Sequence, residues 1–427
     1  MSKLALVWLV LVAGCGGSGD GAAIDAGGAL DAAPDASVGF MRGPSARSEA
    51  AVVFDPTSSK LLLFGGDQGT VQAQVAVPDV VGDSWLLDTR TGMWTALPAG
   101  GPSARSRTVA VYDSSQRRAL VFGGRYRVKG APSSAAYTLY NEVWAFSFAD
   151  ETWSMLTTSG TAPSRRFFAA AGYDAMANSL YIFGGNTSTA GVNFIPAGDT
   201  FQLELGTGAW TTVAATGPAA RHYAQFAFDE GRRRLVVFSG KGASFNPPSF
   251  ADTWALDVAQ APPTWTRLDP GVGTGAPIAR FGGAMVYDKD RDRLLLWGGH
   301  HDENTAGDIA NDSWAFNLSS NSWARLRMGD TINGTQCIVG GAVIEPLGLD
   351  YATPDLMSPE RRFKHALVVN PSAARVLVIG GESDCAKMDD IWQLDLATTD
   401  GVWTRALKAS QGEGCVRRND QCPCFCN

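Results

Sequence analysis

Leu61-Leu62-Leu63-Phe64-Gly65-Gly66 decides the fold of this chain, because a short apolar run followed by a glycine pair recurs six times, with an aromatic residue before the pair in all copies but the last, which has Ile379. The copies end at Gly66, Gly124, Gly185, Gly240, Gly299 and Gly381. In the fourth copy Ser239 replaces the first glycine. Self-similarity at a period of several tens of residues indicates a repeat architecture before any single residue is interpreted.

The register around each glycine pair is constant. An arginine stands 18 residues before the first position of each pair, and an acid further on stands two positions before an aromatic residue. The arginines are Arg47, Arg105, Arg166, Arg221, Arg280 and Arg362. The acids are Asp83, Glu142, Asp199, Asp252, Asp312 and Asp390. A tryptophan closes each copy: Trp94, Trp153, Trp210, Trp265, Trp323 and Trp403.

These motifs resemble the kelch repeat, which in its family forms one four-stranded blade of a β-propeller. The resemblance implies an all-β, six-bladed propeller of the galactose oxidase and kelch type, with four antiparallel strands per blade. We expect the propeller to span residues 40–407, with an insertion at 327–357. The resemblance bears on the fold alone, because function belongs to sites that are grafted onto folds.

The order of strands within a blade decides which loops share a face. We expect strand a after the arginine, strand b before the glycine pair, strand c after the acid and strand d at the closing tryptophan. Consecutive antiparallel strands then place the a–b and c–d turns at one end, called here the a–b face. The b–c and d–a connections lie at the other end, the b–c face. The b–c loops vary from 8 to 17 residues between the glycine pair and the acid. Variable loops on a constant scaffold usually carry binding, so we predict that ligands bind at the b–c face.

The N-terminus predicts export and a lipid anchor. Residues 1–14 form an apolar run that is too short to span a membrane and is typical of a signal peptide. Leu11-Val12-Ala13-Gly14-Cys15 resembles a bacterial lipobox, which implies lipidation of Cys15. An ordinary signal with an incidental cysteine is the alternative. Residues 15–39, rich in Gly, Ala and Asp, predict a flexible linker. We therefore expect a protein of the bacterial cell envelope, anchored by lipid to the outer membrane on its periplasmic or exposed side.

The other cysteines predict disulfides, because six remain after Cys15 and an even number is usual in exported proteins. Cys337, in the insertion, and Cys385, in the last b–c loop, fall on the same face and are expected to pair. The tail at residues 408–427 carries the others: Cys415, Cys422, Cys424 and Cys426. Two bridges are expected there. A four-thiolate metal site is the alternative, which an oxidising compartment disfavours.

Charge and composition argue against some classes of binding partner. The formal net charge is −7 and no domain is basic, which argues against nucleic-acid binding. His300-His301-Asp302-Glu303 is the one cluster of metal-binding residue types, but its spacing matches no familiar zinc site. We expect a monomer with a protein or glycan ligand, no cofactor and no metal.

The six arginines have two interpretations. If they ring the mouth of the central channel, their guanidinium groups could receive carboxylates, as related kelch adaptor domains do with acidic peptides. The six acids repeat just as regularly, however, and could hold the arginines in structural salt bridges. Repetition in every unit favours the structural role. Selectivity is then expected in the b–c loops, at Arg125, Tyr126, Arg127, Lys129, Phe245, Phe250, His300 and His301.

The sequence therefore predicts a surface-tethered or periplasmic binding module for a protein or carbohydrate. The alternative is an enzyme that acts on a sugar, by anomer or epimer interconversion or by oxidation, as some kelch-type propellers do. No catalytic residue is identified, and the oxidase set of tyrosine, histidine and crosslinked cysteine cannot be placed here. A purely structural envelope protein is the third hypothesis.

Overall fold

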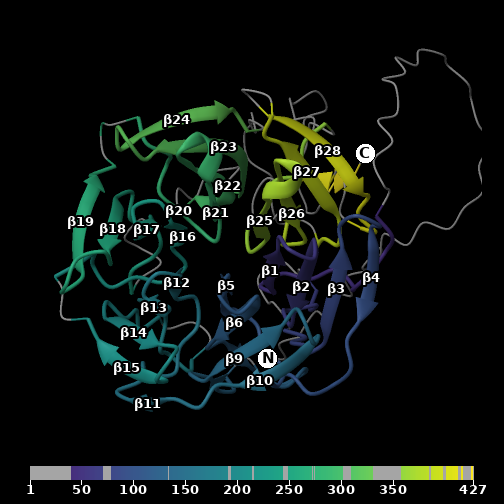
Figure 1. Ribbon diagram of the computed structural model, residues 1–427. Coiled ribbons are helices and arrows are strands. Elements are labelled where there is room, and N and C mark those ends of the chain that lie inside the picture. The colour runs from purple at the N-terminus through teal and green to yellow at the C-terminus, as the bar shows by residue number, and fades with distance from the viewer. Residues whose placement is uncertain are drawn as a thin grey trace, which may run out of the picture. The chain divides into compact units, whose positions relative to one another are not determined.

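The structure is a computed structural model. It describes residues 40–70, 78–132, 134–190, 194–213, 216–243, 249–271, 273, 275–301, 309–329, 357–383, 386–397 and 401–411, and the backbone of 415–416 and 425–426. The chain divides into two units, Met1–Ser37 and Val38–Asn427, and all described residues belong to the second. This second unit is a six-bladed, all-β propeller with antiparallel four-stranded sheets, which confirms the predicted fold (Figure 1).

Each blade uses four strands in chain order, from strand a at the axis to strand d at the rim (Figure 1). Blade 1 consists of β1 (Ala51–Asp55), β2 (Lys60–Phe64), β3 (Ser84–Asp88) and β4 (Met93–Ala96). Blade 2 consists of β5 (Val109–Asp113), β6 (Arg118–Phe122), β9 (Val143–Ser147) and β10 (Thr152–Met155). Blade 3 consists of β12 (Ala170–Asp174), β13 (Ser179–Phe183), β14 (Thr200–Glu204) and β15 (Ala209–Thr212).

The second half of the propeller follows the same plan. Blade 4 consists of β16 (Gln225–Asp229), β17 (Arg234–Phe238), β18 (Thr253–Asp257) and β19 (Thr264–Asp269). Blade 5 consists of β21 (Ala284–Asp288), β22 (Arg293–His301), β23 (Ile309–Asn317) and β24 (Ser322–Arg327). Blade 6 consists of β25 (Ala366–Asn370), β26 (Arg375–Ile379), β27 (Ile391–Asp395) and β28 (Val402–Leu407).

Several short elements lie outside this plan. In blade 5, β22 continues through the glycine pair to His301 and pairs with β20 (Arg280–Phe281). Strand b is therefore longer here than the sequence predicts, because we expected it to end at the glycine pair. The others are β7 (Arg125–Tyr126), β8 (Thr138–Leu139), β11 (Ser159–Gly160), β29 (Cys415–Val416), β30 (Phe425–Cys426), and the 3₁₀ turns η1 (Lys289–Arg291) and η2 (Pro371–Ala373).

The glycine pair is where neighbouring blades meet through their backbones. Gly65 has a φ of 66°, and a Cβ built on it would lie 2.5 Å from the carbonyl oxygen of Arg105 in the next blade. The N–H of Gly66 donates to that same carbonyl at 3.0 Å. A side chain has no room there, which explains the recurrence of glycine.

Ser239 shows how blade 4 manages without the first glycine. It keeps a left-handed φ of 59°, and its hydroxyl lies 2.7 Å from the carbonyl oxygen of Arg280 and accepts the Arg280 N–H at 2.8 Å. The hydroxyl thus joins blades 4 and 5 through hydrogen bonds that offset the cost of a non-glycine residue in this conformation.

The closing tryptophans pack between blades, as their regular recurrence predicts. Each of five lies against the aromatic residue that precedes the glycine pair of the preceding blade, at ring-centroid distances of 4.8 to 6.0 Å. The pairs are Phe64–Trp153, Phe122–Trp210, Phe183–Trp265, Phe238–Trp323 and Trp297–Trp403. Trp153, Trp265 and Trp323 also donate their indole N–H groups to hydroxyls of the preceding blade. The aromatic side chains therefore fill and fix the gaps between twisted sheets.

Among the described strands, those of the first and last blades each come from one continuous stretch of chain, and no strand is exchanged between them. Blade 6 meets blade 1 through the same contacts that join the other neighbours: Gly381 donates to the carbonyl of Arg47 at 2.9 Å. Phe40 adds a bond from its N–H to the carbonyl of Ala406 at 3.1 Å.

Candidate ligand-binding face

The six repeated arginines are buried and paired within their own blades. Each is at most 3% exposed, and its closest carboxylate oxygen lies 2.5 to 2.9 Å away. The pairs are Arg47–Asp83, Arg105–Glu142, Arg166–Asp199, Arg221–Asp252, Arg280–Asp312 and Arg362–Asp390.

Arg221 shows the full set of contacts. Its Nε donates to the carbonyl of Ala219 at 3.0 Å, and Nη1 donates to the carbonyl of Ser239 at 2.9 Å and to Asp252 at 2.7 Å. Trp254, two residues after the acid, donates its indole N–H to Asp252 at 2.7 Å, which explains the acid-x-aromatic spacing. Burial by itself raises the pKa of Asp252, but the Arg221 guanidinium holds it below its ordinary value. These donors are used inside the blade, so little of the guanidinium is available to a ligand.

A second set of repeated residues closes the central channel at its b–c end. The residue two positions after each arginine has a φ between 54° and 64°, and its N–H donates to the carbonyl of its counterpart in the preceding blade, at 2.7 to 3.2 Å. These six hydrogen bonds form a closed circle, called here the channel-end ring. Its members are Glu49, Arg107, Phe168, Tyr223, Gly282 and Lys364.

The side chains of the channel-end ring meet across the axis. Glu49 of blade 1 forms an ion pair with Arg107 at 2.7 Å and accepts a hydrogen bond from the hydroxyl of Tyr223 at 3.3 Å. Tyr223 belongs to blade 4, opposite blade 1, so this contact spans the channel. Burial opposes ionisation of Glu49, yet the charges of Arg107, Lys364 and Arg125 hold the pKa of its carboxyl well below the usual range.

Arg125 differs from the other cations of the b–c face. It follows the glycine pair of blade 2 and is only 7% exposed, with its guanidinium 3.9 Å from the ring centroid of Tyr137 and 4.9 Å from that of Phe167. Within the described part of the chain, no carboxylate lies within 4.0 Å of it and its Nε has no hydrogen-bond partner. Burial and the nearby charge of Arg107 lower the pKa of Arg125 to about 10, so it remains charged at neutral pH. The carboxylate of Glu49 attracts Arg125 without forming a direct ion pair with it. A buried cation that lacks a direct carboxylate partner is costly, and an anionic ligand would reduce that cost.

Other positive and aromatic groups surround Arg125. Arg127 is also buried and stacks on Tyr137 at 4.5 Å. His222 is 1% exposed, and burial together with the charges of Arg107, Lys241 and Arg125 lowers its pKa to about 3. Burial is the largest cause of this depression, and the three cations add to it. We call this group the Arg125 site; it consists of Arg125, Arg127, Tyr137, Phe167, His222 and Lys241.

The remaining predicted residues of the loops are dispersed. Tyr126 is half-buried in β7, and Lys129 is exposed and paired with Asp79 at 2.6 Å. Phe250 lies 4.1 Å from the guanidinium of Arg221, and His300 stacks on Phe281 at 4.7 Å.

The last two predicted loop residues, His301 and Phe245, are not placed at the Arg125 site. The backbone of His301 pairs with Arg280, and Phe245 lies outside the described residues. Of the predicted set, the structure thus brings Arg125 and Arg127 together. Sequence reasoning missed Tyr137, Phe167, His222 and Lys241; the available signal for Lys241 was its position directly after a glycine pair, as for Arg125.

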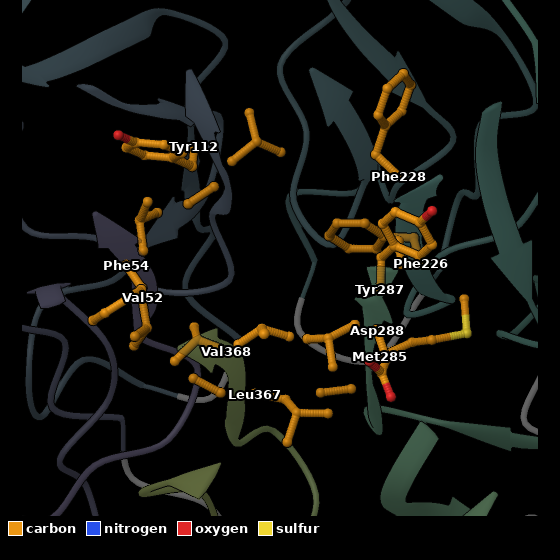
Figure 2. A pocket seen from close by; sticks show the side chains of 18 of the residues that line it. Val52, Phe54, Tyr112, Phe226, Phe228, Met285, Tyr287, Asp288, Leu367 and Val368 are labelled. Carbon is orange, nitrogen blue, oxygen red and sulfur yellow. The ribbon is translucent and has the colours of Figure 1, made fainter. Parts of the chain in front are cut away.

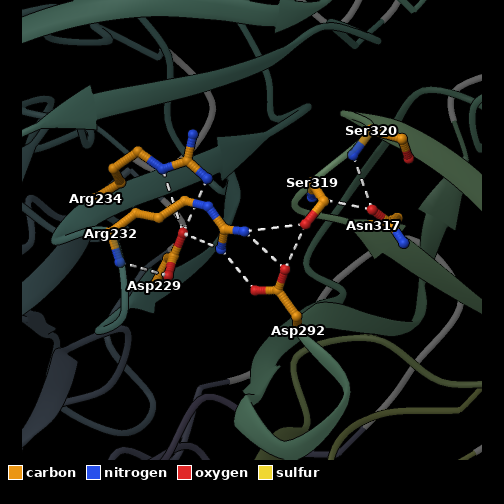
Figure 3. Close-up of polar contacts among 7 residues, drawn as sticks. All are labelled: Asp229, Arg232, Arg234, Asp292, Asn317, Ser319 and Ser320. Atoms are coloured by element: carbon orange, nitrogen blue, oxygen red, sulfur yellow. Dashed lines mark hydrogen bonds and ion pairs between the residues drawn. The ribbon is translucent and has the colours of Figure 1, made fainter.

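The basic turns of the a–b face, by contrast, are neutralised. Arg232 bridges Asp229 of its own turn and Asp292 of the next blade, with its shortest contact to Asp292 at 2.6 Å, and Ser319 closes the network (Figure 3). Arg234 binds the same Asp229 at 2.9 Å (Figure 3). Arg232 thus joins blades 4 and 5, and both arginines have direct carboxylate partners, unlike Arg125 at the b–c face.

The structure describes only part of the predicted cysteine and metal-binding features. The backbone register sets Cys415 opposite Cys426, whereas Cys15, Cys337, Cys385, Cys422 and Cys424 lie outside the described residues. Across the described ranges, no group of three or more His, Cys, Asp or Glu side chains gathers as metal ligands do. Nor does any helix in those ranges have the length and apolar character needed to cross a bilayer.

Comparison with known proteins agrees with this geometry. The family profile of the KLHDC2/KLHL20/DRC7 Kelch-repeats domain matches residues 39–217 and 173–343, which together cover more than half of the chain. The protein belongs to the kelch-repeat family. Its propeller is similar in fold to the solved structure titled "Structure of YjhT", with a TM-score of 0.59 and 13% identity over 86% of this chain and 99% of that one.

Two curated relatives show how far the sequences have diverged. Kelch domain-containing protein 10 of Xenopus laevis is 27% identical over 67% of this chain and 66% of its own length. Serine/threonine-protein phosphatase BSL2 of Arabidopsis thaliana is 26% identical over 70% of this chain and 27% of its own length. The chain therefore spans less than two thirds of the length of these relatives.

Proposed function

We propose that this protein is a kelch-propeller binding module that captures a protein or carbohydrate ligand through its b–c face, with a carboxylate of the ligand bound at the Arg125 site. The observation that carries the proposal is the state of Arg125, which is buried and charged, has an Nε without a hydrogen-bond partner, and forms no direct ion pair with any carboxylate of the described residues. A carboxylate there would gain charge-assisted hydrogen bonds from a planar donor group that stacking on Tyr137 already orients.

Only Arg125, and not the six repeated arginines, is proposed to bind the carboxylate of the ligand. The six repeated arginines already have carboxylate partners and serve the blades, whereas Arg125 stands at the one position after a glycine pair that holds an arginine. The buried rings of Tyr137 and Phe167, 3.9 to 4.9 Å from the guanidinium groups of Arg125 and Arg127, hold these donors in place for the bound acid.

A binding array tests this function. Purified Cys15→Ser protein, which lacks the proposed lipid acceptor, is applied to immobilised acidic peptides, their amidated counterparts, and acidic and neutral glycans. We expect retention on carboxylate ligands that falls as salt rises. Arg125→Ala should weaken it about tenfold, the scale of one charge-assisted hydrogen bond. Arg165→Ala removes an exposed arginine of blade 3 and serves as the control, with less than about twofold change expected.

Equal retention by wild type and Arg125→Ala, or a preference for neutral ligands, would contradict the assignment. Arg125→Lys adds a finer comparison, because it keeps the charge but loses the planar fork and should recover only part of the binding.

We also propose that Cys15 is lipidated and tethers the propeller to the cell envelope through the linker at 15–39. The lipobox-like Leu11 to Cys15 supports this tether. In cells labelled with a fatty acid, wild type should carry label and sediment with membranes, and Cys15→Ser should carry none and be released or left unprocessed. Unchanged membrane retention of Cys15→Ser would overturn the anchor.

A further inference from the structure

The six a strands enclose a cavity that the b–c face does not use. Its volume is about 670 Å³, and Val52, Phe54, Ala110, Phe226, Met285 and Leu367 are among the side chains that line it. In Figure 2 the hydroxyls of Tyr112 and Tyr287 point away from the open space, which leaves the two sides of the cavity with apolar surface. The hydroxyl of Tyr112 is used elsewhere, as a donor to Asp55 at 2.6 Å.

The cavity is blind at the b–c end. Its lining begins with Ala50, Thr108 and Ala224, each one residue beyond a member of the channel-end ring. The ring above is closed by six backbone hydrogen bonds and by the contact of Tyr223 with Glu49 across the axis. A ligand in the cavity is therefore separated from the Arg125 site by this closed layer.

The other end reaches the a–b face. Pro56, Ser114, Glu230, Lys289 and Pro371, all in or beside the a–b turns, belong to the lining at this end. Entry is therefore from the a–b face, where the polar rim meets water.

The walls of the cavity decide the class of ligand. Val52, Phe226 and Leu367 are only partly buried, as are many of the other apolar side chains that line the cavity. An apolar guest would remove this surface from water, worth about 25 cal/mol per Å². The charged residues of the lining, Glu230, Asp288, Lys289, Asp290 and Arg291, lie in or beside the a–b turns at the open end. A charged group carried further in would meet apolar walls and lose its hydration. A volume of about 670 Å³ also falls within the usual range of small-molecule sites.

We infer that the central cavity is a second binding site, open to the a–b face, for a small uncharged apolar molecule, aliphatic or aromatic, that enters along the propeller axis. The site is independent of ligand capture at the b–c face, because the channel-end ring lies between them.

Fluorescence of N-phenyl-1-naphthylamine, an uncharged aromatic probe that brightens in apolar surroundings, tests this site in the Cys15→Ser protein. We expect saturable binding of one probe per chain. Val52→Trp should fill the cavity and weaken probe affinity at least tenfold. Val402→Trp makes the same exchange on the outermost strand of blade 6, at a residue that is 55% exposed, and should change affinity less than twofold.

Two results would overturn the inference: no saturable brightening with folded wild type, or equal affinity of wild type and folded Val52→Trp. Circular dichroism and a melting curve establish folding for every variant. Because overpacking can destabilise a core, Phe226→Ala provides a second route: it widens the cavity and should change probe affinity at least threefold. An unchanged affinity in folded Phe226→Ala would refute the site as well.

Discussion

Arg221→Ala tests the structural role of the repeated arginines. The substitution removes the donors to two backbone carbonyls, those of Ala219 and Ser239, and the partner of Asp252. Each orphaned carbonyl costs about 1 kcal/mol, and breaking a buried ion pair costs about 3 to 5 kcal/mol. The carboxylate of Asp252 keeps 19% exposure and regains some hydration, so we expect a total loss of about 3 to 5 kcal/mol in the free energy of unfolding.

Urea denaturation of wild type, Arg221→Ala and Arg165→Ala measures this loss. Arg165→Ala removes the same charge from an exposed side chain and should stay within about 0.5 kcal/mol of wild type. Adding an acidic ligand identified on the array should raise the stability of wild type and Arg221→Ala by the same increment. A destabilisation below about 1 kcal/mol, together with lost ligand binding, would refute the structural role and make the arginine ring a receptor.

Three further outcomes are expected. Ser239→Ala should lower the free energy of unfolding, measured in urea, by about 1 to 3 kcal/mol, because it leaves the Arg280 N–H without an acceptor. Ser239→Gly loses the same acceptor but relieves the left-handed backbone, so its loss should be about 1 kcal/mol smaller. Equal losses in the two variants would contradict this account of Ser239. Burial lowers the pKa of His365 to about 3 from an ordinary 6.5, so the unfolded chain binds the extra proton and stability falls between pH 6.5 and 3, by about 2 kcal/mol at pH 5. His365→Gln should lack that part of the loss, and identical pH profiles of wild type and variant would exclude it. Non-reducing peptide mapping should find Cys337 joined to Cys385; a free Cys337, or one joined to the tail, would disprove the pairing.

The fold could be predicted from the repeat motifs because each motif supplies residues that make a contact between blades or within one. The glycine pair marks a point where a Cβ would meet the next blade, and the acid-x-aromatic step marks a carboxylate held by an arginine and an indole. Such contacts recur from blade to blade, so the six copies of the motif together supported one fold prediction that a single copy could not. The extension of β22 to His301 was not predictable, because pairing in a b–c loop depends on the opposite segment β20 rather than on the repeat.

The candidate site was predictable only in part. Arg125 and Arg127 stood out as charges in a long loop, but their burial depends on Tyr137, which reaches them through the hairpin of β7 and β8. No sequence motif singles out His222, which lies beneath the same face, where burial and the charges of Arg107 and Lys241 lower its pKa. Side chains from different blades converge there, and that convergence is set by the closure of the ring. The central cavity was invisible in the sequence for the same reason, since its walls come from all six a strands.

Hydrogen–deuterium exchange with and without an acidic ligand taken from the array measures most directly where the protein binds. We predict slower exchange in the b–c loop of blade 2, from Arg125 to Tyr137, and at the b–c ends of blade 4 next to His222 and Lys241, with no change in the a–b turns. Protection confined to the a–b turns or to the outermost strands, with the loop of blade 2 unchanged, would contradict binding at the Arg125 site.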